Sequence, residues 1–550
     1  MAQQQLLNRE THQAAFPQLN DFQISELANF AECQSFSAGT TLVEAGAKEF
    51  NFYVVKSGVL EVIDRSSGED RTLVIAKERE LIGDMANVKG NPATATVIVK
   101  EDCEVWVISN EKLKKILGQK SGLSDLILQT FIARCQALKN SDYTGLRVIG
   151  TSECRDTFRI QDFLDRNHLI FTWINLNDDH DVQEILDQFE ITEADLPVVV
   201  SGNQWVLKNP DNEKLAYCLG IKKTLENKLY DLAVIGAGPG GLAAAVYGAS
   251  EGLDTVILEK EALGGQASCS SKIENYLGFP TGLSGRELAC RANIQAQKFG
   301  SQFSVPSEVV NLDCQGDRTV LELHDGNKII ARSILIATGV SYRRLPISGI
   351  EKYDGVGIYY SATTVEAEIC GGQTIVIVGG GNSAGQAAVF MSKHAQEVKL
   401  LIRGDNLAKS MSDYLLQRVQ TIPNIEIMTH TEVTGVEGEQ ILETIEITNN
   451  QTQSSTKINV CALFIFIGAK PRTDWLPSAI ETDAKGYIKT GHEIADSPHW
   501  SIERTPFFLE TSCRGIFAAG DVRSDSIKRV ASAVGEGSMA VKFVHQVIAE

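Results

Sequence analysis

The clearest pattern of apolar positions in the chain lies between Asp231 and Lys260. An apolar run at residues 232–235 predicts a buried strand, and the alanine-rich stretch after a cluster of glycines predicts a helix. A second apolar run at residues 255–258 predicts another strand. Strand, helix and strand in this order predict a βαβ unit with a parallel sheet.

The turn of this unit carries Gly236, Gly238 and Gly241, with Pro239 beside them. Gly236 permits a tight turn, Gly238 lets the backbone approach a pyrophosphate, and Gly241 lets the helix pack on the strand. The first helical turn offers free N–H groups and a positive dipole end to phosphates. Glu259 ends the second strand, where a carboxylate accepts the hydroxyls of an adenosine ribose. The unit is therefore predicted to bind a dinucleotide.

A second unit of the same kind is predicted from a strand at 374–378, a helix at 384–394 and a strand at 397–402. This last strand ends in a cation, Arg403, and Lys409 follows. An acid suits the ribose of FAD, whereas a cation tolerates a 2′-phosphate, so we assign FAD to the first unit and NADPH to the second, with NADH as the alternative. Its candidate nucleotide-binding residues are Gly379, Gly381, Asn382, Ser383, Ala384, Arg403 and Lys409.

Two more segments are predicted to complete the flavin site. A buried strand near residues 516–519 stops at Asp521, whose carboxylate is expected to hydrogen-bond the ribityl chain. A helix over 530–549 is expected to aim its N-terminus at the flavin pyrimidine and to stabilise negative charge there. The candidate residues at these segments and at the end of the preceding nucleotide strand are Thr338, Gly339, Gly520, Asp521, Arg529, Val530 and Ala531.

The N-terminal part has a different pattern. Residues 1–140 show a short polar helix at 21–31 and then short β-like runs punctuated by glycine, which predict a jelly-roll barrel. Two amphipathic helices follow, at 110–117 and 122–138. Residues 144–222 then predict a small α/β domain in the order βαβαββ, with its first strand at 146–149, helices at 158–166 and 182–189, and the pair Leu196-Pro197 at a strand start.

Length and charge bound the rest of the picture. A chain of 550 residues is expected to form about three to five domains. The formal charge of −19 disfavours nucleic acid and anionic membrane as main partners. No run of 18 apolar residues occurs and the N-terminus lacks the pattern of a signal peptide, so we expect a soluble, cytoplasmic protein. The 11 cysteines form no CxxC, which disfavours a metal site and fits reduced thiols.

Residues 1–140 resemble the cyclic nucleotide-binding domain of bacterial regulators, in the run Phe52-Tyr53-Val54-Val55-x-x-Gly58, in Gly83-Asp84-Met85-Ala86 and in Pro92-Ala93-Thr94-Ala95-Thr96. The resemblance implies an acid on the ribose, here Asp84, and an arginine on the cyclic phosphate, where this chain has Ala93. Loss of that cation removes a charge-assisted contact. We therefore expect this domain to act in docking or regulation, with cyclic nucleotide binding as the less favoured alternative.

Residues 144–222 resemble a thioredoxin or glutaredoxin-like domain, with Pro197 at the cis-proline of that family. The CxxC of the family is here Cys154-Arg155-Asp156-Thr157, which keeps only the first cysteine. A cysteine at a helix N-terminus beside an arginine is expected to have a lowered pKa. Cys154 is thus the one candidate catalytic residue, and an incidental cysteine in a domain kept for its contacts is the alternative.

From Gly236 to Glu550 the chain resembles low-molecular-weight bacterial thioredoxin reductase. The resemblance implies a multidomain α/β fold with two Rossmann-like domains: an FAD domain at 228–346 and 472–550, and an NAD(P)H domain at 347–471 inserted in it. It also implies a swing of the inserted domain about joints near 345–350 and 468–472, and homodimers are common in the family. The matching residues are Gly236, Gly238, Gly241, Glu259, Gly265, Gln266, Asn275, Thr338, Gly379, Gly381, Asp521, Arg529, Val530 and Ala531.

The chain departs from that family at the redox-active dithiol. Ser361 and Thr364 occupy the two cysteine positions, and Val365 replaces the expected proton donor. Hydroxyls cannot cycle between dithiol and disulfide. Three hypotheses for the electron acceptor stay open. The first is Cys154 or a mixed disulfide on the thioredoxin-like domain, and the second is an iron–sulfur or flavin protein, by resemblance to ferredoxin-NADP reductases that lack CxxC. The third is a redox or nucleotide sensor with residual catalysis.

Overall fold

The computed structural model describes residues 14–65, 70–89, 92–139, 145–167, 169–177, 191–201, 205–270, 272–313, 318–500 and 502–550. The chain divides into two compact units. The first contains Met1–Gly150, Leu169–Thr224 and Ile294–Gln302, and the second contains Thr151–His168, Leu225–Asn293 and Phe303–Glu550. Within the described residues, no helix combines the length and the apolar character needed to cross a bilayer.

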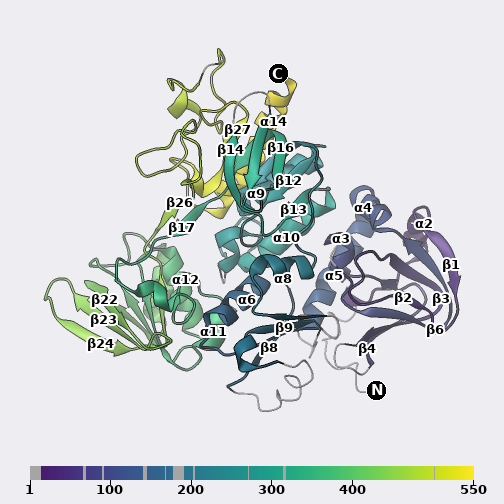
Figure 1. Cartoon of the computed structure of the whole chain (residues 1–550), viewed down its shortest axis with the longest axis horizontal. Helices are drawn as coiled ribbons and strands as arrows, with labels where there is room; N and C mark the ends of the chain where they lie inside the picture. The colour runs from purple at the N-terminus through teal and green to yellow at the C-terminus, as the bar shows by residue number, and fades with distance from the viewer. Residues whose placement is uncertain are drawn as a thin grey trace. The chain divides into compact units, whose positions relative to one another are not determined.

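The first unit begins with the predicted β-rich domain. Its antiparallel strands are β1 (Glu32–Phe36), β2 (Thr41–Val43), β3 (Phe52–Asp64), β4 (Arg71–Ala76), β5 (Leu81–Ile82) and β6 (Thr96–Ile108), in the order β1-β6-β3-β4 with β2 on β6 and β5 on β3. The helices α2 (Asp21–Ala28), α3 (Met85–Lys89), α4 (Asn110–Gln119) and α5 (Ser121–Lys139) gather at one end (Figure 1). Helix α2 ends before the predicted Ala31 because the Asn29 side chain donates to the Ser25 carbonyl over 3.0 Å and caps the helix.

A four-stranded sheet follows in the same unit. Its strands are β7 (Leu146–Gly150), β8 (Thr172–Asn175), β9 (Val198–Ser201) and β10 (Trp205–Lys208), in the order β10-β9-β7-β8 with only β7 and β8 parallel. Helix α8 (Asn212–Cys218) comes after β10. The Leu196–Pro197 peptide bond is cis, as the resemblance implied. The helix predicted at 182–189 lies outside the described residues.

The second unit contains the first nucleotide-binding fold. Strands β11 (Leu229–Ile235), β12 (Thr255–Leu258), β13 (Gln302–Ser304), β14 (Val309–Asp313), β15 (Thr319–Leu323), β16 (Lys328–Ile336) and β27 (Ile516–Ala518) form one sheet in the order β13-β12-β11-β16-β15-β14, with β27 on β16. Strands β12, β11, β16 and β27 are parallel to one another. The bounds of β12 are those predicted from the apolar pattern, and β11 begins earlier than predicted, at Leu229.

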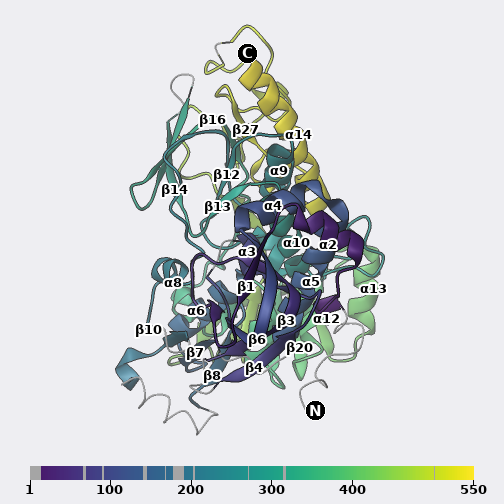
Figure 2. The same ribbon diagram turned by 90° about the vertical axis from the view of Figure 1, so that its right-hand side faces the viewer.

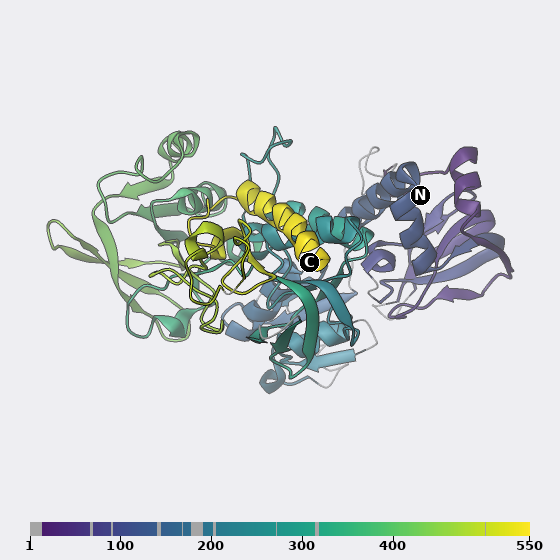
Figure 3. The same ribbon diagram turned by 90° about the horizontal axis from the view of Figure 1, so that it is seen from above.

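Helices α9 (Pro239–Ser250) and α14 (Val530–Ala549) lie side by side along this sheet, as Figures 1 and 2 show. Small residues make this contact close. A Cβ at Gly537 would lie 2.0 Å from the Gly240 carbonyl oxygen, and a Cβ at Gly240 would lie 3.1 Å from the Ala533 carbonyl oxygen. Figure 3 shows α14 running to the C-terminus. Helix α10 (Gly285–Lys298) completes the helices of this fold.

The second nucleotide-binding fold is inserted into the first. Its parallel strands β18 (Ile358–Tyr359), β19 (Thr374–Val378), β20 (Glu397–Leu401), β21 (Ile425–Met428) and β25 (Ala462–Ile465) are ordered β18-β25-β19-β20-β21. Its helices are α11 (Thr364–Ile369), α12 (Asn382–Met391) and α13 (Asp413–Thr421). An antiparallel sheet of β22 (Thr431–Glu437), β23 (Thr444–Asn449) and β24 (Ser455–Asn459) extends from it (Figure 1).

The insertion enters and leaves through two paired strands. Strand β17 (Val340–Tyr342) pairs antiparallel with β26 (Ala469–Pro471), so the two chain crossings lie next to each other. Both predicted joints, at 345–350 and 468–472, adjoin this ribbon. Helix α6 (Arg155–Arg166) also belongs to the second unit and starts three residues before the predicted Phe158, which makes Cys154 its N-cap residue.

Candidate active site

A cavity of about 290 Å³ opens beyond the carboxyl ends of β11, β12 and β16. Ligands of open α/β sheets bind at this edge. Segments far apart in the sequence contribute to its lining, which includes the predicted residues Gly236, Gly238, Pro239, Glu259, Gly265, Gln266, Thr338, Gly339, Ser383, Gly520, Asp521, Arg529 and Val530. The structure therefore brings together most of the flavin-binding residues expected from the sequence.

The three glycines of the first glycine-rich turn each have a different structural role. Gly236 has φ +101° and a Cβ there would lie 2.4 Å from the Ala337 carbonyl oxygen, so the turn requires glycine. A Cβ at Gly241 would lie 1.9 Å from the Gly236 carbonyl oxygen. Gly238 has open space where its Cβ would be, and as the N-cap of α9 it adds no side-chain cap. Free N–H groups at the start of α9 therefore face room for a phosphate.

Glu259 is buried at the end of β12 and lines the cavity. Its Oε2 accepts the Ala237 N–H over 2.7 Å and its Oε1 accepts the Glu261 N–H over 2.8 Å. Burial raises the pKa of Glu259, although these two hydrogen bonds oppose the shift. Each carboxylate oxygen keeps a second lone pair, which fits the two hydroxyls of a ribose.

The opposite wall comes from the C-terminal segment. Asp521 lines the cavity and burial raises its pKa. Helix α14 begins behind Arg529, an N-cap residue that makes no side-chain cap hydrogen bond. The turn before Asp521 is fixed by Glu536, whose carboxylate accepts the Gly520 N–H over 2.6 Å and pairs with Arg523 at 2.7 Å. A second uncapped helix N-terminus thus faces the cavity.

The second glycine-rich turn repeats the backbone design of the first. Gly379 has φ +141° and a Cβ there would lie 2.3 Å from the Phe466 carbonyl oxygen, whereas Gly381 has open space around its Cβ position. Helix α12 starts at Asn382, two residues before the predicted start, because Gly381 adopts the N-cap conformation. Asn382 Oδ1 accepts the Ser412 N–H over 2.7 Å, and Ala384 is buried.

The residues expected to contact a 2′-phosphate are on the surface. Arg403 is exposed at the end of β20, and its carbonyl oxygen accepts the Asn450 side-chain N–H over 3.0 Å. Lys409 forms an ion pair with Asp405 at 2.9 Å, and this hydrogen bond lowers the pKa of Asp405. The positive charge of Lys409 is therefore partly neutralised by its own neighbour.

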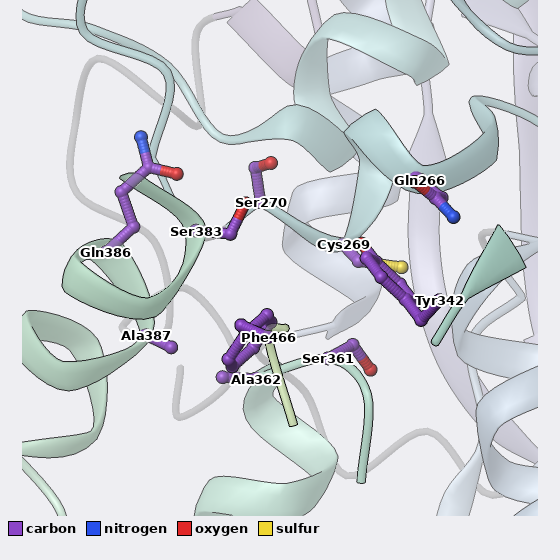
Figure 4. A pocket seen from close by; sticks show the side chains of 10 residues that line it. All are labelled: Gln266, Cys269, Ser270, Tyr342, Ser361, Ala362, Ser383, Gln386, Ala387 and Phe466. Atoms are coloured by element: carbon purple, nitrogen blue, oxygen red, sulfur yellow. The ribbon is translucent and has the colours of Figure 1, made fainter. Parts of the chain in front are cut away.

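A smaller pocket joins the two nucleotide-binding folds (Figure 4). Gln266, Cys269, Ser270 and Tyr342 contribute from the flavin side, and Ser361, Ala362, Ser383, Gln386, Ala387 and Phe466 from the other side. It shares Gln266, Ser270, Tyr342 and Ser383 with the large cavity. Burial raises the pKa values of Cys269 and Tyr342, so both are neutral near pH 7.

Glu366, a residue that the sequence analysis missed, lies next to the pocket residue Ser361. Ser361, which the resemblance places at the first cysteine position of the thioredoxin reductase dithiol, donates a hydrogen bond to Glu366 Oε1 over 3.0 Å. Glu366 is fully buried, also accepts the N–H and the hydroxyl of Thr363, and closes a capping box at the start of α11. Burial raises its pKa. In the sequence, Glu366 could have been found as the acidic residue directly after Val365, which replaces the expected proton donor.

The fold brings together two cysteines, Cys370 and Cys461, whose proximity could not be predicted from the sequence. The Cys461 thiol donates to the Ile369 carbonyl over 3.9 Å, and its interaction with the neighbouring Cys370 thiol lowers the pKa of Cys461 and raises that of Cys370. The Cys461 N–H donates to the carbonyl of Thr374, the first residue of β19. The glycine-rich turn follows the last residue of that strand, so the thiol pair lies at the end of the sheet opposite the nucleotide site. It does not replace the missing dithiol.

Helix α6 supplies a second residue that the sequence analysis did not identify, Arg166, which lines the large cavity. Its first turn contacts the inserted fold, where the Phe158 ring lies 5.2 Å from the Tyr359 ring. Cys154 is half-buried one turn before Phe158. The predicted residues outside the linings of both cavities are Cys154, Gly241, Asn275, Gly379, Gly381, Asn382, Ala384, Arg403, Lys409 and Ala531. Asn275 and Ala531 are exposed.

Comparison with known proteins agrees with this geometry. Residues 230–537 match the family model described as pyridine nucleotide-disulphide oxidoreductase, and residues 33–120 match the cyclic nucleotide-binding domain. The chain is 33% identical over 325 residues to a 34.2 kDa protein in the rubredoxin operon of Clostridium pasteurianum, covering 59% of this chain and 98% of that protein. It is 32% identical over 320 residues to thioredoxin reductase of Mycoplasmopsis pulmonis, covering 58% and 97%.

A solved structure gives the same result. Thioredoxin reductase of Lactococcus lactis, in its FR conformation, aligns with a TM-score of 0.52 and 28% identity over 58% of this chain and 99% of that chain. The multidomain α/β fold with an N-terminal β-rich domain is thus confirmed. The chain belongs to the pyridine nucleotide-disulphide oxidoreductase family, as an FAD-dependent NAD(P)H oxidoreductase of the thioredoxin reductase type.

Proposed function

We propose that the large cavity holds FAD and that the chain transfers electrons from NADPH through this flavin to an acceptor without a dithiol of its own. The observation that supports this most is the convergence of Gly238, Glu259 and Asp521 on one cavity. The free N–H groups behind Gly238 would bind the diphosphate, Glu259 the adenosine ribose and Asp521 the ribityl chain. Bound flavin would supply hydride acceptance and electron release.

The residues at the second turn would orient the pyridine nucleotide. Gly381 leaves space for its diphosphate, and Ser383 lines both cavities and so stands between the two nucleotides. Arg403 would select NADPH through its 2′-phosphate. Because Lys409 is paired with Asp405, we expect only a moderate preference for NADPH over NADH.

The acceptor must lie outside the position of the family dithiol. The Ser361 hydroxyl donates a hydrogen bond to Glu366, and this side chain carries no sulfur. For a disulfide acceptor the overall reaction would be RSSR + NADPH + H⁺ giving 2 RSH + NADP⁺. For an iron–sulfur or flavin protein, the flavin would deliver two electrons one at a time.

A disulfide acceptor that binds close to Cys154 is the second candidate, and the position of α6 favours it. Cys154 is the N-cap residue of α6, whose Phe158 packs on Tyr359 two residues before Ser361. A half-buried thiol in that place would meet a disulfide partner at the helix N-terminus. A redox sensor with residual catalysis stays the third reading.

Rapid mixing with NADPH under anaerobic conditions tests the flavin step, and bleaching of the visible flavin band is the expected result. Acceptors are then compared in steady state with the wild type and Cys154→Ser. Reduction of an added thioredoxin disulfide that is lost in Cys154→Ser supports the disulfide acceptor. Reduction of an added ferredoxin that is unchanged in this variant supports the iron–sulfur acceptor. Failure of NADPH and NADH to bleach the flavin would refute the proposed function.

A further inference from the structure

The last turn of α6 forms part of the wall of the large cavity. Arg166 lines this cavity together with Gly238, Glu259 and Arg472. Its Nη1 and Nη2 atoms lie 3.4 Å from Glu261 Oε2, and Nη1 lies 3.5 Å from Asp162 Oδ2. A side chain from the segment that precedes the flavin fold therefore reaches into the predicted flavin site.

The N–H groups of this guanidinium make only long hydrogen bonds to the protein or none. Charge-assisted hydrogen bonds between arginine and carboxylate normally measure about 2.7 to 2.9 Å, well below the distances at Arg166. Its Nε is buried and has no hydrogen-bond partner among the described residues. Glu261 is already held at 3.0 Å by Arg472. A guanidinium with a buried N–H that lacks an acceptor is costly unless a ligand completes its hydrogen bonds.

We propose that Arg166 binds the adenosine diphosphate half of FAD, so that the flavin site is shared between α6 and the first nucleotide-binding fold. The inference rests on the flavin site proposed above. The diphosphate presents oxygen acceptors and two negative charges, which the planar fork of an arginine guanidinium binds in bidentate fashion and lysine does not. Arg166 contacts Glu261, whose N–H donates to Glu259, the expected contact of the ribose, and this contact assigns Arg166 to the adenosine diphosphate half of the cofactor.

Contacts on both sides of Arg166 hold α6 in place. Asp165 forms an ion pair with Arg286 at the start of α10. Asn167 Nδ2 donates to the Glu261 carbonyl over 3.3 Å and to the Phe163 carbonyl over 2.9 Å. Together with the Phe158 and Tyr359 contact, these interactions order the helix before cofactor binds. A pre-ordered arginine loses less side-chain entropy on binding.

The test is the affinity of the flavin-free full-length protein for FAD, measured by quenching of flavin fluorescence. Arg166→Gln is expected to weaken FAD binding about 10- to 100-fold, the range for a lost hydrogen bond to a charged group. Arg166→Lys keeps the charge but lacks the planar guanidinium, and its affinity for FAD is expected to lie between those of the wild type and Arg166→Gln. Arg291→Gln removes an arginine that pairs with Glu287 on the exposed face of α10 and is expected to match the wild type.

Adenosine diphosphate, used as a competitor of FAD, identifies the half of the cofactor concerned. Its inhibition constant is expected to rise by the same factor in Arg166→Gln. Circular dichroism of each variant checks folding, and if Arg166→Gln does not fold, the comparison uses Arg166→Lys. Equal FAD or ADP affinity in wild type and Arg166 variants would overturn the inference and leave the proposed function standing. A wild type that binds no FAD would overturn both.

Discussion

The Ser361 hydroxyl donates a hydrogen bond to the buried carboxylate of Glu366 over 3.0 Å. The resemblance to thioredoxin reductases implies that Ser361 stands where that family has a cysteine of the redox-active pair. Here it belongs to a polar network that closes the N-terminus of α11, since Glu366 also binds Thr363. The segment around Ser361 therefore serves as a structural cap of α11.

We expect Glu366→Ala to destabilise the protein by about 2 kcal/mol, because it leaves half-buried donors of Thr363 and Ser361 without an acceptor. Glu368→Ala, an exposed carboxylate on the same helix, is the matched control and should change stability by less than about 0.5 kcal/mol. Urea denaturation of both variants measures the difference. Equal midpoints for the two would show that the Ser361–Glu366 network contributes no stability.

The raised pKa of Glu259 predicts acid release of FAD above the ordinary glutamate pKa of 4.5. In the flavin-free protein this shift stabilises the fold below pH 4.5, and the stabilisation is lost as pH rises through the folded-state pKa. The affinity for FAD depends on pH in the opposite direction from the stability, because the ribose hydroxyls need the ionised carboxylate as acceptor. Affinity should fall as pH falls through the raised pKa.

Flavin fluorescence during acidification checks this pH dependence. Glu259→Gln should bind FAD more weakly near pH 7 and lose the pH-dependent step, because its side chain does not titrate. The account of Glu259 would be wrong if wild type and Glu259→Gln released FAD along the same pH curve.

Arg403→Gln should raise the KM for NADPH about tenfold with little change for NADH, because only NADPH presents a 2′-phosphate to the guanidinium. Asp405→Asn should lower the KM for NADPH, since it frees Lys409 from its ion pair. Steady-state kinetics with both nucleotides measure the two effects, and NADH serves as the internal control. A parallel change for NADPH and NADH in Arg403→Gln would argue against 2′-phosphate recognition.

Cyclic AMP at millimolar concentration should not shift the melting temperature of the wild type. Asp84, at the position expected to bind ribose, accepts the Ala86 N–H over 2.8 Å and the hydroxyl of Thr94. Ala93 is buried where the related domains have arginine. Ala93→Arg should restore the missing cation and with it a measurable shift. A shift in the wild type would mean that this domain binds the nucleotide without that arginine.

Much of the fold could be predicted from the sequence because its apolar runs are unambiguous. The strands at 255–258 and 374–378 and the helix at 530–549 have the predicted bounds. Helix ends were less accurate where a cap decided them, as at Asn29 and Gly381. The glycine turns could be placed because backbone geometry leaves no alternative to glycine at Gly236 and Gly379.

The parts of the site that were missed depend on contacts between distant segments. Arg166 meets Glu261 across 95 positions, and no local pattern marks an arginine on an amphipathic helix as part of a nucleotide site. Cys370 and Cys461 are brought together only by the pairing of β19 with β25. Glu366 follows the expected acid position by one residue, and only its burial distinguishes it from the exposed Glu368.

The central claim is that electrons pass through a flavin with no sulfur couple beside it. Anaerobic titration of the purified protein with NADPH tests it most directly. One equivalent of NADPH should bleach each flavin completely, and the double variant Ser361→Cys, Thr364→Cys should consume a second equivalent through its dithiol. A wild type that lacks flavin, that never bleaches, or that takes up two equivalents per flavin would contradict the claim.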